Sequence, residues 1–271
     1  MSSVVIDDHL LRDVLSGERP ADLDGLGRGG LATTGLWLFS LCSSFAAPTV
    51  LGKLSGPGAG LPAALQAAFG SYVDPALAQR LLAQESSIFD GEAVEATVFF
   101  ADVRGFTNFA ASVEPEDAVA ELNRLFAILV PAIRDAGGHP NRYTGDGILA
   151  VFGTPEPLRD HADAAVRAAL TIQQGVRDVF GDALRLGIGI NTGKVIAGSI
   201  GAAGKLDFTV IGDVVNVAAR VEEHTKQTGD PILLTQTTLD AMTCRPEFHL
   251  DRGAVTLRGK DAPVRLYGLG V

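Results

Sequence analysis

The spacing of apolar residues beyond residue 93 predicts a sheet covered by helices. Residues 94–101 form a β-branched and aromatic run, which is typical of a buried strand. Apolar side chains then return at helical spacing over residues 115–134 and again over residues 160–179, as expected of helices that cover a sheet face. The side chains predicted to face inward are Val119, Leu122, Leu125, Phe126 and Leu129 in the first helix, and Ala164, Ala165, Ala168, Leu170 and Ile172 in the second.

The remaining pattern extends this sheet. Residues 139–153 predict two short strands joined across a turn at residues 144–147. Further segments are predicted as strands over residues 184–191, 194–200 and 207–211, and as a helix over residues 213–226. The order strand, helix, strand, strand, helix, strand is the split βαβ pattern of a ferredoxin-like sheet. We therefore expect an α+β fold, with extra strands through residues 254–269.

The first 92 residues are organised differently. Glycine-rich stretches separate short predicted helices over residues 1–71. This pattern predicts a small helical region with a regulatory or membrane-proximal role. Asp74 and Pro75 then start a connector helix within residues 72–92, because Asp is a favoured N-cap and Pro a favoured first helical residue. The third part is the α+β domain over residues 93–271.

The uncharged stretch of residues 29–52 has the length of a membrane span. Serine, threonine, proline and glycine dilute its apolar character, and the arginines before it would place the rest of the chain outside the cytosol. A buried or interface-forming helical hairpin therefore fits this stretch better than a membrane segment. Membrane contact through residues 29–52 stays the alternative.

Composition excludes several classes of protein. With 46% hydrophobic and 20% charged residues, the chain is neither disordered nor a coiled coil nor collagen-like. Its net charge is −10, with acidic residues in excess in both halves, so we expect no nucleic-acid binding. Cys42 and Cys244 are far apart and have no metal-ligand spacing, which predicts packing roles in a reducing compartment. The acidic N-terminus is unlike a secretory signal, so a cytoplasmic location is expected.

Two glycine-rich stretches approach phosphate-binding motifs without matching them. Residues 198–205 end in Gly-Lys but are one residue too long for a P-loop, and Leu206 follows where Ser or Thr is needed. The glycines of residues 187–193 miss the dinucleotide spacing by one. We interpret both stretches as turns.

Two aspartates are candidates for a metal site. Asp102 ends the first predicted strand, and Asp146 sits at the tip of the predicted hairpin. Each alone is compatible with an ordinary turn residue. In a split βαβ sheet, however, the first strand and the hairpin are central antiparallel neighbours, so both carboxylates can emerge at one edge. Paired carboxylates suit divalent cations beside a phosphate chain.

A third candidate segment begins the helix over residues 213–226. Val214, Val217 and Ala218 are expected to face inward, so Asn216 and Arg220, four residues apart, project together from one exposed side. A solvated pair is the ordinary interpretation. An amide beside a guanidinium also suits a ribose and a phosphoryl group.

These three segments, in this order and at these separations, resemble the class III nucleotidyl cyclases, the adenylyl and guanylyl cyclases, over about residues 72–271. The family carries a strand-end F-x-D-[IV]-x-G-F-T, a K-x-x-G-D hairpin and a Y-T-V-I-G-D-x-V-N-x-A-x-R helix entry, and all three are recognisable here. The resemblance implies two Mg²⁺ or Mn²⁺ ions. By this resemblance Asp102, the Val103 carbonyl and Asp146 would bind the metal ions, and the amides of Gly105, Phe106 and Thr107 would bind the β- and γ-phosphates. Asn216 would orient the ribose, and Arg220 would neutralise the charge at the phosphorus. Arg258 or, as second choice, Lys260 would contact the triphosphate.

The base-selecting positions depart from the pattern. Arg142 stands where the family has an adenine-selecting Lys, and Thr209 is a type that bacterial adenylyl cyclases of the family use beside it. Arg is longer and flatter than Lys, so this exchange is not neutral. Related guanylyl cyclases carry Glu and a small polar residue or Cys at these places, and the positive Arg142 is the wrong charge for guanine. ATP is therefore the favoured substrate.

The resemblance implies formation of 3′,5′-cyclic AMP and pyrophosphate from ATP, at sites shared across a homodimer. Three alternatives remain at this stage: a guanylate cyclase, a catalytically silent nucleotide-binding module, and a signalling scaffold whose function lies in residues 1–71.

Overall fold

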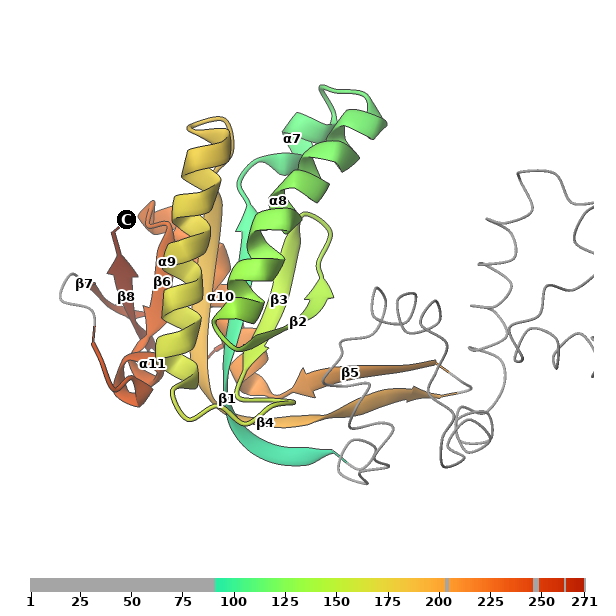
Figure 1. Ribbon diagram of the computed structural model, residues 1–271. Coiled ribbons are helices and arrows are strands. Elements are labelled where there is room, and N and C mark those ends of the chain that lie inside the picture. The colour runs from blue at the N-terminus through green and yellow to red at the C-terminus, as the bar shows by residue number, and fades with distance from the viewer. Residues whose placement is uncertain (1–90, 203–204, 246–248, 261, 271) are drawn as a thin grey trace, which may run out of the picture. The chain divides into compact units, whose positions relative to one another are not determined.

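The structure is a computed structural model that describes residues 91–202, 205–245, 249–260 and 262–270 (Figure 1). The predictions for residues 1–71, for the stretch 29–52, for Cys42 and for nearly all of the connector over residues 72–92 lie outside these residues. Within the described ranges, no helix combines the length and the apolar character needed to span a membrane.

The fold is the predicted α+β arrangement around a ferredoxin-like sheet. In the described residues, one eight-stranded sheet has the order β2-β3-β1-β4-β6-β8-β7, and β5 pairs with β4. Its strands are β1 (Glu92–Val103), β2 (Gly138–Tyr143), β3 (Gly147–Phe152), β4 (Leu186–Ala202), β5 (Lys205–Ile211), β6 (Ile232–Thr235), β7 (His249–Val255) and β8 (Val264–Leu269). Central β1 is antiparallel to both of its neighbours, β3 and β4. The end of β1 and the tip of the β2–β3 hairpin therefore meet at one edge.

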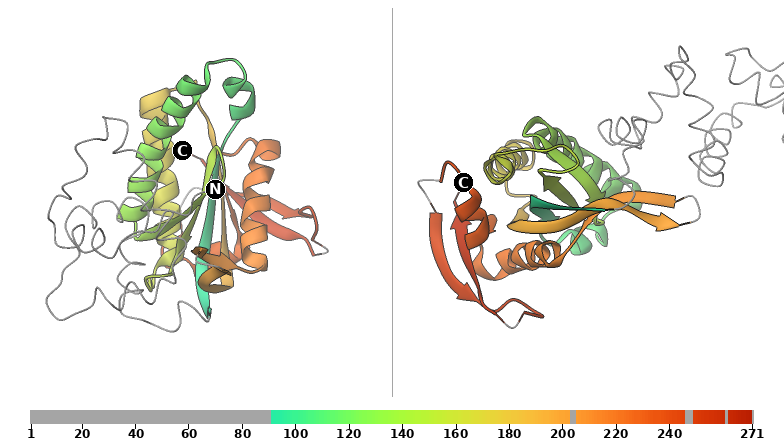
Figure 2. Two further views of the ribbon diagram at one scale, coloured as in Figure 1. Left: turned by 90° about the vertical axis from the view of Figure 1, so that its right-hand side faces the viewer. Right: turned by 90° about the horizontal axis from the view of Figure 1, so that it is seen from below.

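Helices cover both faces of this sheet (Figure 2). They are α7 (Phe106–Ala110), α8 (Pro115–Asp135), α9 (His161–Phe180), α10 (Asp213–Thr228) and α11 (Gln236–Ala241). The long helices α8 and α9 lie on one side and α10 on the other. α8 begins with Pro115, since proline is favoured at the first helical position. Glu116 and Asp117 lie in its first turn, where acidic side chains are favourable.

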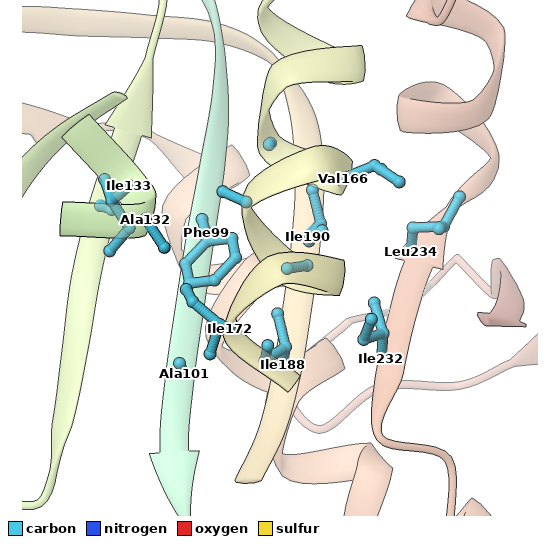
Figure 3. Close-up of a cluster of buried hydrophobic side chains, with 14 of the residues drawn as sticks. Phe99, Ala101, Ala132, Ile133, Val166, Ile172, Ile188, Ile190, Ile232 and Leu234 are labelled. Carbon is cyan, nitrogen blue, oxygen red and sulfur yellow. The ribbon is translucent and has the colours of Figure 1, made fainter. Parts of the chain in front are cut away.

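Alternation along β1 divides its side chains between two cores. Phe99 and Ala101 lie in one core with Ile133 of α8 and Ile172 of α9 (Figure 3). Val98 lies in a second core that includes Ala218 of α10. Because successive strand residues point to opposite faces, Asp102 falls on the α10 face.

Several expectations from the pattern are wrong. Residues 184–200 do not form two strands with a turn: β4 is continuous, because residues 191–194 stay paired with β1. Val119 and Leu170 are exposed, although the spacing placed them inward. Cys244 is also exposed and has no packing role. The pattern did not predict the short elements α7, β6 and α11, and its extra strands over residues 254–269 include only the last two residues of β7.

Candidate active site

The carboxylates of Asp102 and Asp146 come together at the edge of the sheet. In the β1–β3 ladder Asp102 lies opposite Gly147, the residue that follows Asp146. A Cβ atom at Gly147 would lie 2.4 Å from the Ala101 carbonyl oxygen and 2.8 Å from Asp102 Oδ1, so only glycine allows this approach. Burial, and then the negative charge of Asp146, raise the pKa of Asp102. Two repelling acids at one edge fit a site that takes a cation.

Oxygen ligands of this kind suit Mg²⁺ or Mn²⁺. Within the described part of the chain, no group of three or more His, Cys, Asp or Glu side chains is arranged for a metal ion. Ligands beyond the two carboxylates would therefore be backbone carbonyls, such as that of Val103, and oxygens of a bound nucleotide. A substrate with a phosphate chain would complete such a site.

The last turns of α10 add charged groups that the sequence did not single out. Lys226 Nζ lies 3.4 Å from Asp102 Oδ2. Glu222 is 7% exposed, and burial, followed by the charge of Asp102, raises its pKa to about 7. The sequence could have pointed to Glu222, because this carboxylate lies on the same helix face as Val221 and Thr225, which are buried.

Arg104 fixes the chain just beyond the metal-site candidates. One of its guanidinium nitrogens, Nη2, donates to the carbonyl oxygens of Thr225, at 3.1 Å, and Asp230, at 2.6 Å. Its backbone N–H donates to the Arg185 carbonyl at 2.8 Å. Burial lowers the pKa of this arginine. Arg104 therefore ties the end of β1 to the end of α10.

Gly105 then turns the chain into the short helix α7. Its φ of 75° lies in the left-handed region that favours glycine. Intrahelical bonding starts with the N–H groups of Asn108 and Phe109, which donate to the Gly105 carbonyl. The amides of Phe106 and Thr107 precede them, at the open end of the helix.

Arg142 and Thr209 belong to one neighbourhood. Arg142 is exposed near the end of β2. The side chain of Asn141, the residue before it, donates to the Phe208 carbonyl at 2.9 Å and accepts from Thr209 Oγ1 at 3.3 Å. The strands β2 and β5 therefore place Thr209 beside Asn141, the chain neighbour of Arg142.

The α10 side chains project as the helical spacing predicted. Asn216 is exposed, and the half-exposed Arg220 is 3.1 Å from Glu223. Lys260 forms an ion pair with Asp213 in the first turn of the helix. Arg258 is exposed. Lys260 is therefore held beside the helix start, whereas Arg258 points to solvent.

The candidate residues fall into two groups along α10. Lys226, which contacts Asp102, is ten residues beyond Asn216, and at 1.5 Å per residue this is about 15 Å along the helix axis. Asp102 and Asp146 therefore form one group, while Asn216, with Thr209 close before it in the chain, belongs to another. The candidate metal-binding residues and the candidate ribose-binding residue are therefore separated along α10.

The comparisons with known proteins agree with this geometry. The family described as adenylate and guanylate cyclase catalytic domain matches residues 90–269. The chain belongs to this family, the class III nucleotidyl cyclases. An adenylate cyclase of Anabaena cylindrica is 36% identical over an alignment of 186 residues that covers 63% of this chain and 36% of that protein. A terminal-differentiation specific adenylate cyclase of Dictyostelium discoideum is 33% identical over 200 residues, 70% of this chain and 9% of that protein.

Solved cyclase structures share the fold. The adenylyl cyclase CyaB of P. aeruginosa has a TM-score of 0.60 at 26% identity, covering 68% of this chain and 97% of that one. The guanylyl cyclase Cya2 has a TM-score of 0.57 at 32% identity, covering 66% and 92%. This cyclase chain thus matches about a third or less of the length of the two sequence relatives, and its structural neighbours include both nucleotide specificities.

Proposed function

We propose that this cyclase is an adenylate cyclase, which converts ATP to 3′,5′-cyclic AMP and pyrophosphate. The observation that carries the proposal is the pairing of Asp102 with Gly147, which brings the carboxylates of Asp102 and Asp146 to one edge. In the reaction the ribose 3′-oxygen attacks the α-phosphorus, the bond to the bridging oxygen of pyrophosphate breaks, and the 3′-hydroxyl proton is lost. No covalent enzyme intermediate is required.

Asp102, Asp146 and the Val103 carbonyl would hold two Mg²⁺ or Mn²⁺ ions. Bound there, such ions would lower the pKa of the 3′-hydroxyl and neutralise the triphosphate. The chain contributes a rigid cradle, since Gly147 fixes the separation of the hairpin from β1. It also contributes Lys226, whose charge balances Asp102 before a divalent cation arrives.

The phosphate chain would lie against the turn after β1. The amides of Phe106 and Thr107, exposed by the left-handed turn at Gly105, suit the β- and γ-phosphates. Arg258 is the favoured further contact to the triphosphate, because Lys260 is already paired with Asp213. Lys260 can join only after leaving that carboxylate.

Asn216 would orient the ribose, and Arg220 would neutralise the charge that develops on the α-phosphate oxygens. Arg220 is exposed enough to exchange its Glu223 partner for substrate. Removing one such donor from a preorganised site typically costs about 2.7–4 kcal/mol of transition-state stabilisation.

The base would be read by Thr209 and Arg142. Arg142 donates hydrogen bonds and accepts none, which matches a ring nitrogen acceptor of adenine, and the Thr209 hydroxyl accepts from the exocyclic amine. Guanine presents an oxygen and an N–H at the corresponding edge. Because Arg142 can donate to that oxygen but cannot accept from the N–H, it weakens discrimination between ATP and GTP without favouring GTP.

The separations along α10 between Lys226 and Asn216, about 15 Å, and between Lys226 and Arg220, about 9 Å, support a site completed by a second copy of the chain. In a symmetric homodimer the carboxylates of one copy meet Asn216 and Arg220 of the other, and two equal sites result.

The test is turnover by purified protein with ATP or GTP in the presence of Mn²⁺ or Mg²⁺. Cyclic AMP and pyrophosphate should appear in equal amounts, and Asp102→Asn should abolish both. A clear preference for GTP would make the protein a guanylate cyclase. Nucleotide binding without turnover would make it a silent binding module.

A further inference from the structure

Over residues 187–193, the face of β4 that meets α10 consists of glycines with one exception. Alternate residues Gly187, Gly189, Asn191 and Gly193 point to this face. A Cβ atom at Gly189 would lie 2.2 Å from the Glu222 backbone nitrogen, and one at Gly187 would lie 2.3 Å from Thr225 Oγ1. These glycines, which sequence analysis assigned to a turn, therefore let α10 lie directly on the strand backbone.

Asn191 is the exception, and its buried side chain binds α10. The residue is 5% exposed. Its Nδ2 donates to the Val214 carbonyl at 3.0 Å. Its Oδ1 accepts from Thr235 Oγ1 at 2.8 Å and from Thr237 Oγ1 at 3.1 Å. Because two hydroxyl donors hold the oxygen, the amide is fixed with its NH₂ group toward the helix.

A chain of buried hydroxyls ties Asn191 to the core. Thr235 Oγ1 is 3.1 Å from Thr238 Oγ1, which is 3.2 Å from Thr192 Oγ1. Thr192 Oγ1 is 2.7 Å from Thr97 Oγ1, which in turn is 2.7 Å from His161 Nδ1. The network thus joins β1, β4, β6, α9 and α11, and a satisfied buried network of this kind is rigid.

The anchor acts on the turn that carries the ribose contact. Val214 is two residues before Asn216, within the same helical turn. The N-cap of α10 is Gly212, which has no side chain to bond the first turn. A Cβ atom at Gly193 would lie 2.9 Å from Val214 Cγ2 and would clash with it. Asn191 and Gly193 together therefore define the position of this helical turn.

We propose that Asn191 is a positioning residue for catalysis, which holds the first turn of α10 so that Asn216 and Arg220 reach the substrate. This inference rests on the proposed cyclase function. Asn191 touches no reacting atom, so its contribution is geometric. Displacements of about 1 Å caused by a residue remote from the chemistry can cost on the order of 100-fold in rate.

Gln173 provides a matched control. It is likewise a buried amide, 8% exposed, and its Nε2 donates to the carbonyls of Leu186 at 3.2 Å and Pro231 at 3.0 Å. It extends from α9, on the opposite face of the sheet. Asn191→Leu removes three hydrogen bonds of a buried amide and Gln173→Met removes two, but only the first change frees α10.

The experiment compares these variants by unfolding temperature, steady-state turnover and amide hydrogen exchange. We expect both to lose similar stability. Asn191→Leu should lower kcat about 10- to 100-fold, leave KM for ATP within about threefold, and speed exchange over residues 213–220. Gln173→Met should leave kcat and that exchange near wild type. Equal kcat losses in the two variants, or unchanged exchange in Asn191→Leu, would overturn the inference.

A second pair keeps the test decisive if Asn191→Leu does not fold. Thr237 is exposed and donates to Asn191 Oδ1, so Thr237→Val should lower kcat about two- to fivefold by loosening the amide, and Thr237→Ser should restore it. Equal kcat in the Val and Ser variants would contradict the proposal. A wild-type protein that makes no cyclic nucleotide would instead refute the proposed function, while the exchange comparison would still test the anchor.

Discussion

The ammonium group of Lys226 lies 3.4 Å from the carboxylate of Asp102, across the boundary between α10 and the sheet. Lys226 extends from the last turns of the helix, and Asp102 ends the central strand. An internal cation thus occupies the neighbourhood in which a divalent ion would bind. Two charges of the same sign compete for one carboxylate, so Lys226 raises the metal concentration that the site requires.

Lys226→Met should therefore tighten Mn²⁺ binding. The pair is half-exposed, so the expected gain is small, about two- to fivefold in Kd, as for a surface ion pair of up to about 1 kcal/mol. Calorimetric titration of Mn²⁺ into nucleotide-free protein measures it without turnover. Lys194→Met, which removes an exposed charge on β4, is the control. Weaker Mn²⁺ binding in Lys226→Met would show that Lys226 supports the site.

Glu222 should make stability fall with rising pH. Its pKa is raised from 4.5 to about 7 in the folded protein, so the folded state keeps a proton that the unfolded state loses. Stability is therefore highest below pH 4.5 on account of this group, falls as pH rises toward 7, and then levels off. Glu222→Gln should remove this slope and stabilise the metal-free protein by about 2 kcal/mol at pH 8.

Chemical unfolding of the metal-free protein at several pH values tests this expectation. The exposed neighbour, in the variant Glu223→Gln, is the control. A parallel pH dependence in wild type and Glu222→Gln would rule out a buried, protonated Glu222.

The sequence predicted the elements that carry the site more accurately than the ones around it. Asp102, Asn216 and Arg220 lie on long segments whose bounds the pattern placed within a few residues, and Asp146 lies in the turn of a hairpin that the pattern also predicted. Short elements such as β6 give too little periodicity, so they were missed. The glycines of β4 were assigned to turns, because sequence does not reveal that a helix lies directly on a strand.

Side-chain environment was harder to predict than position. The proximity of Lys226 to Asp102 depends on the register of α10 over β1, which no local pattern encodes. Val119 fits helical spacing, yet it is exposed because the buried stripe of α8 runs through Ala118, Leu125 and Leu129, and Val119 lies beside this stripe. In both cases tertiary packing decided the outcome.

Base selectivity should improve when Arg142 is replaced by Lys. A compact ammonium donates to a ring nitrogen with less steric demand than a guanidinium, so Arg142→Lys should raise the ratio of kcat/KM for ATP over GTP about three- to tenfold, as expected for roughly 1 kcal/mol of discrimination. Competition assays with both nucleotides measure the ratio. The exposed Arg159, changed to Lys, controls for the substitution, and an unchanged ratio in Arg142→Lys would remove Arg142 from the base site.

The shared site is tested most directly by mixing two inactive variants. Asp102→Ala destroys the carboxylate half of the site and Arg220→Ala the other half, so each homodimer should be inactive. In an equimolar mixture half of the dimers are heterodimers, and each has one intact site, so activity should recover to about one quarter of wild type. Heterodimers confirmed by differential tagging that remain inactive would contradict the account.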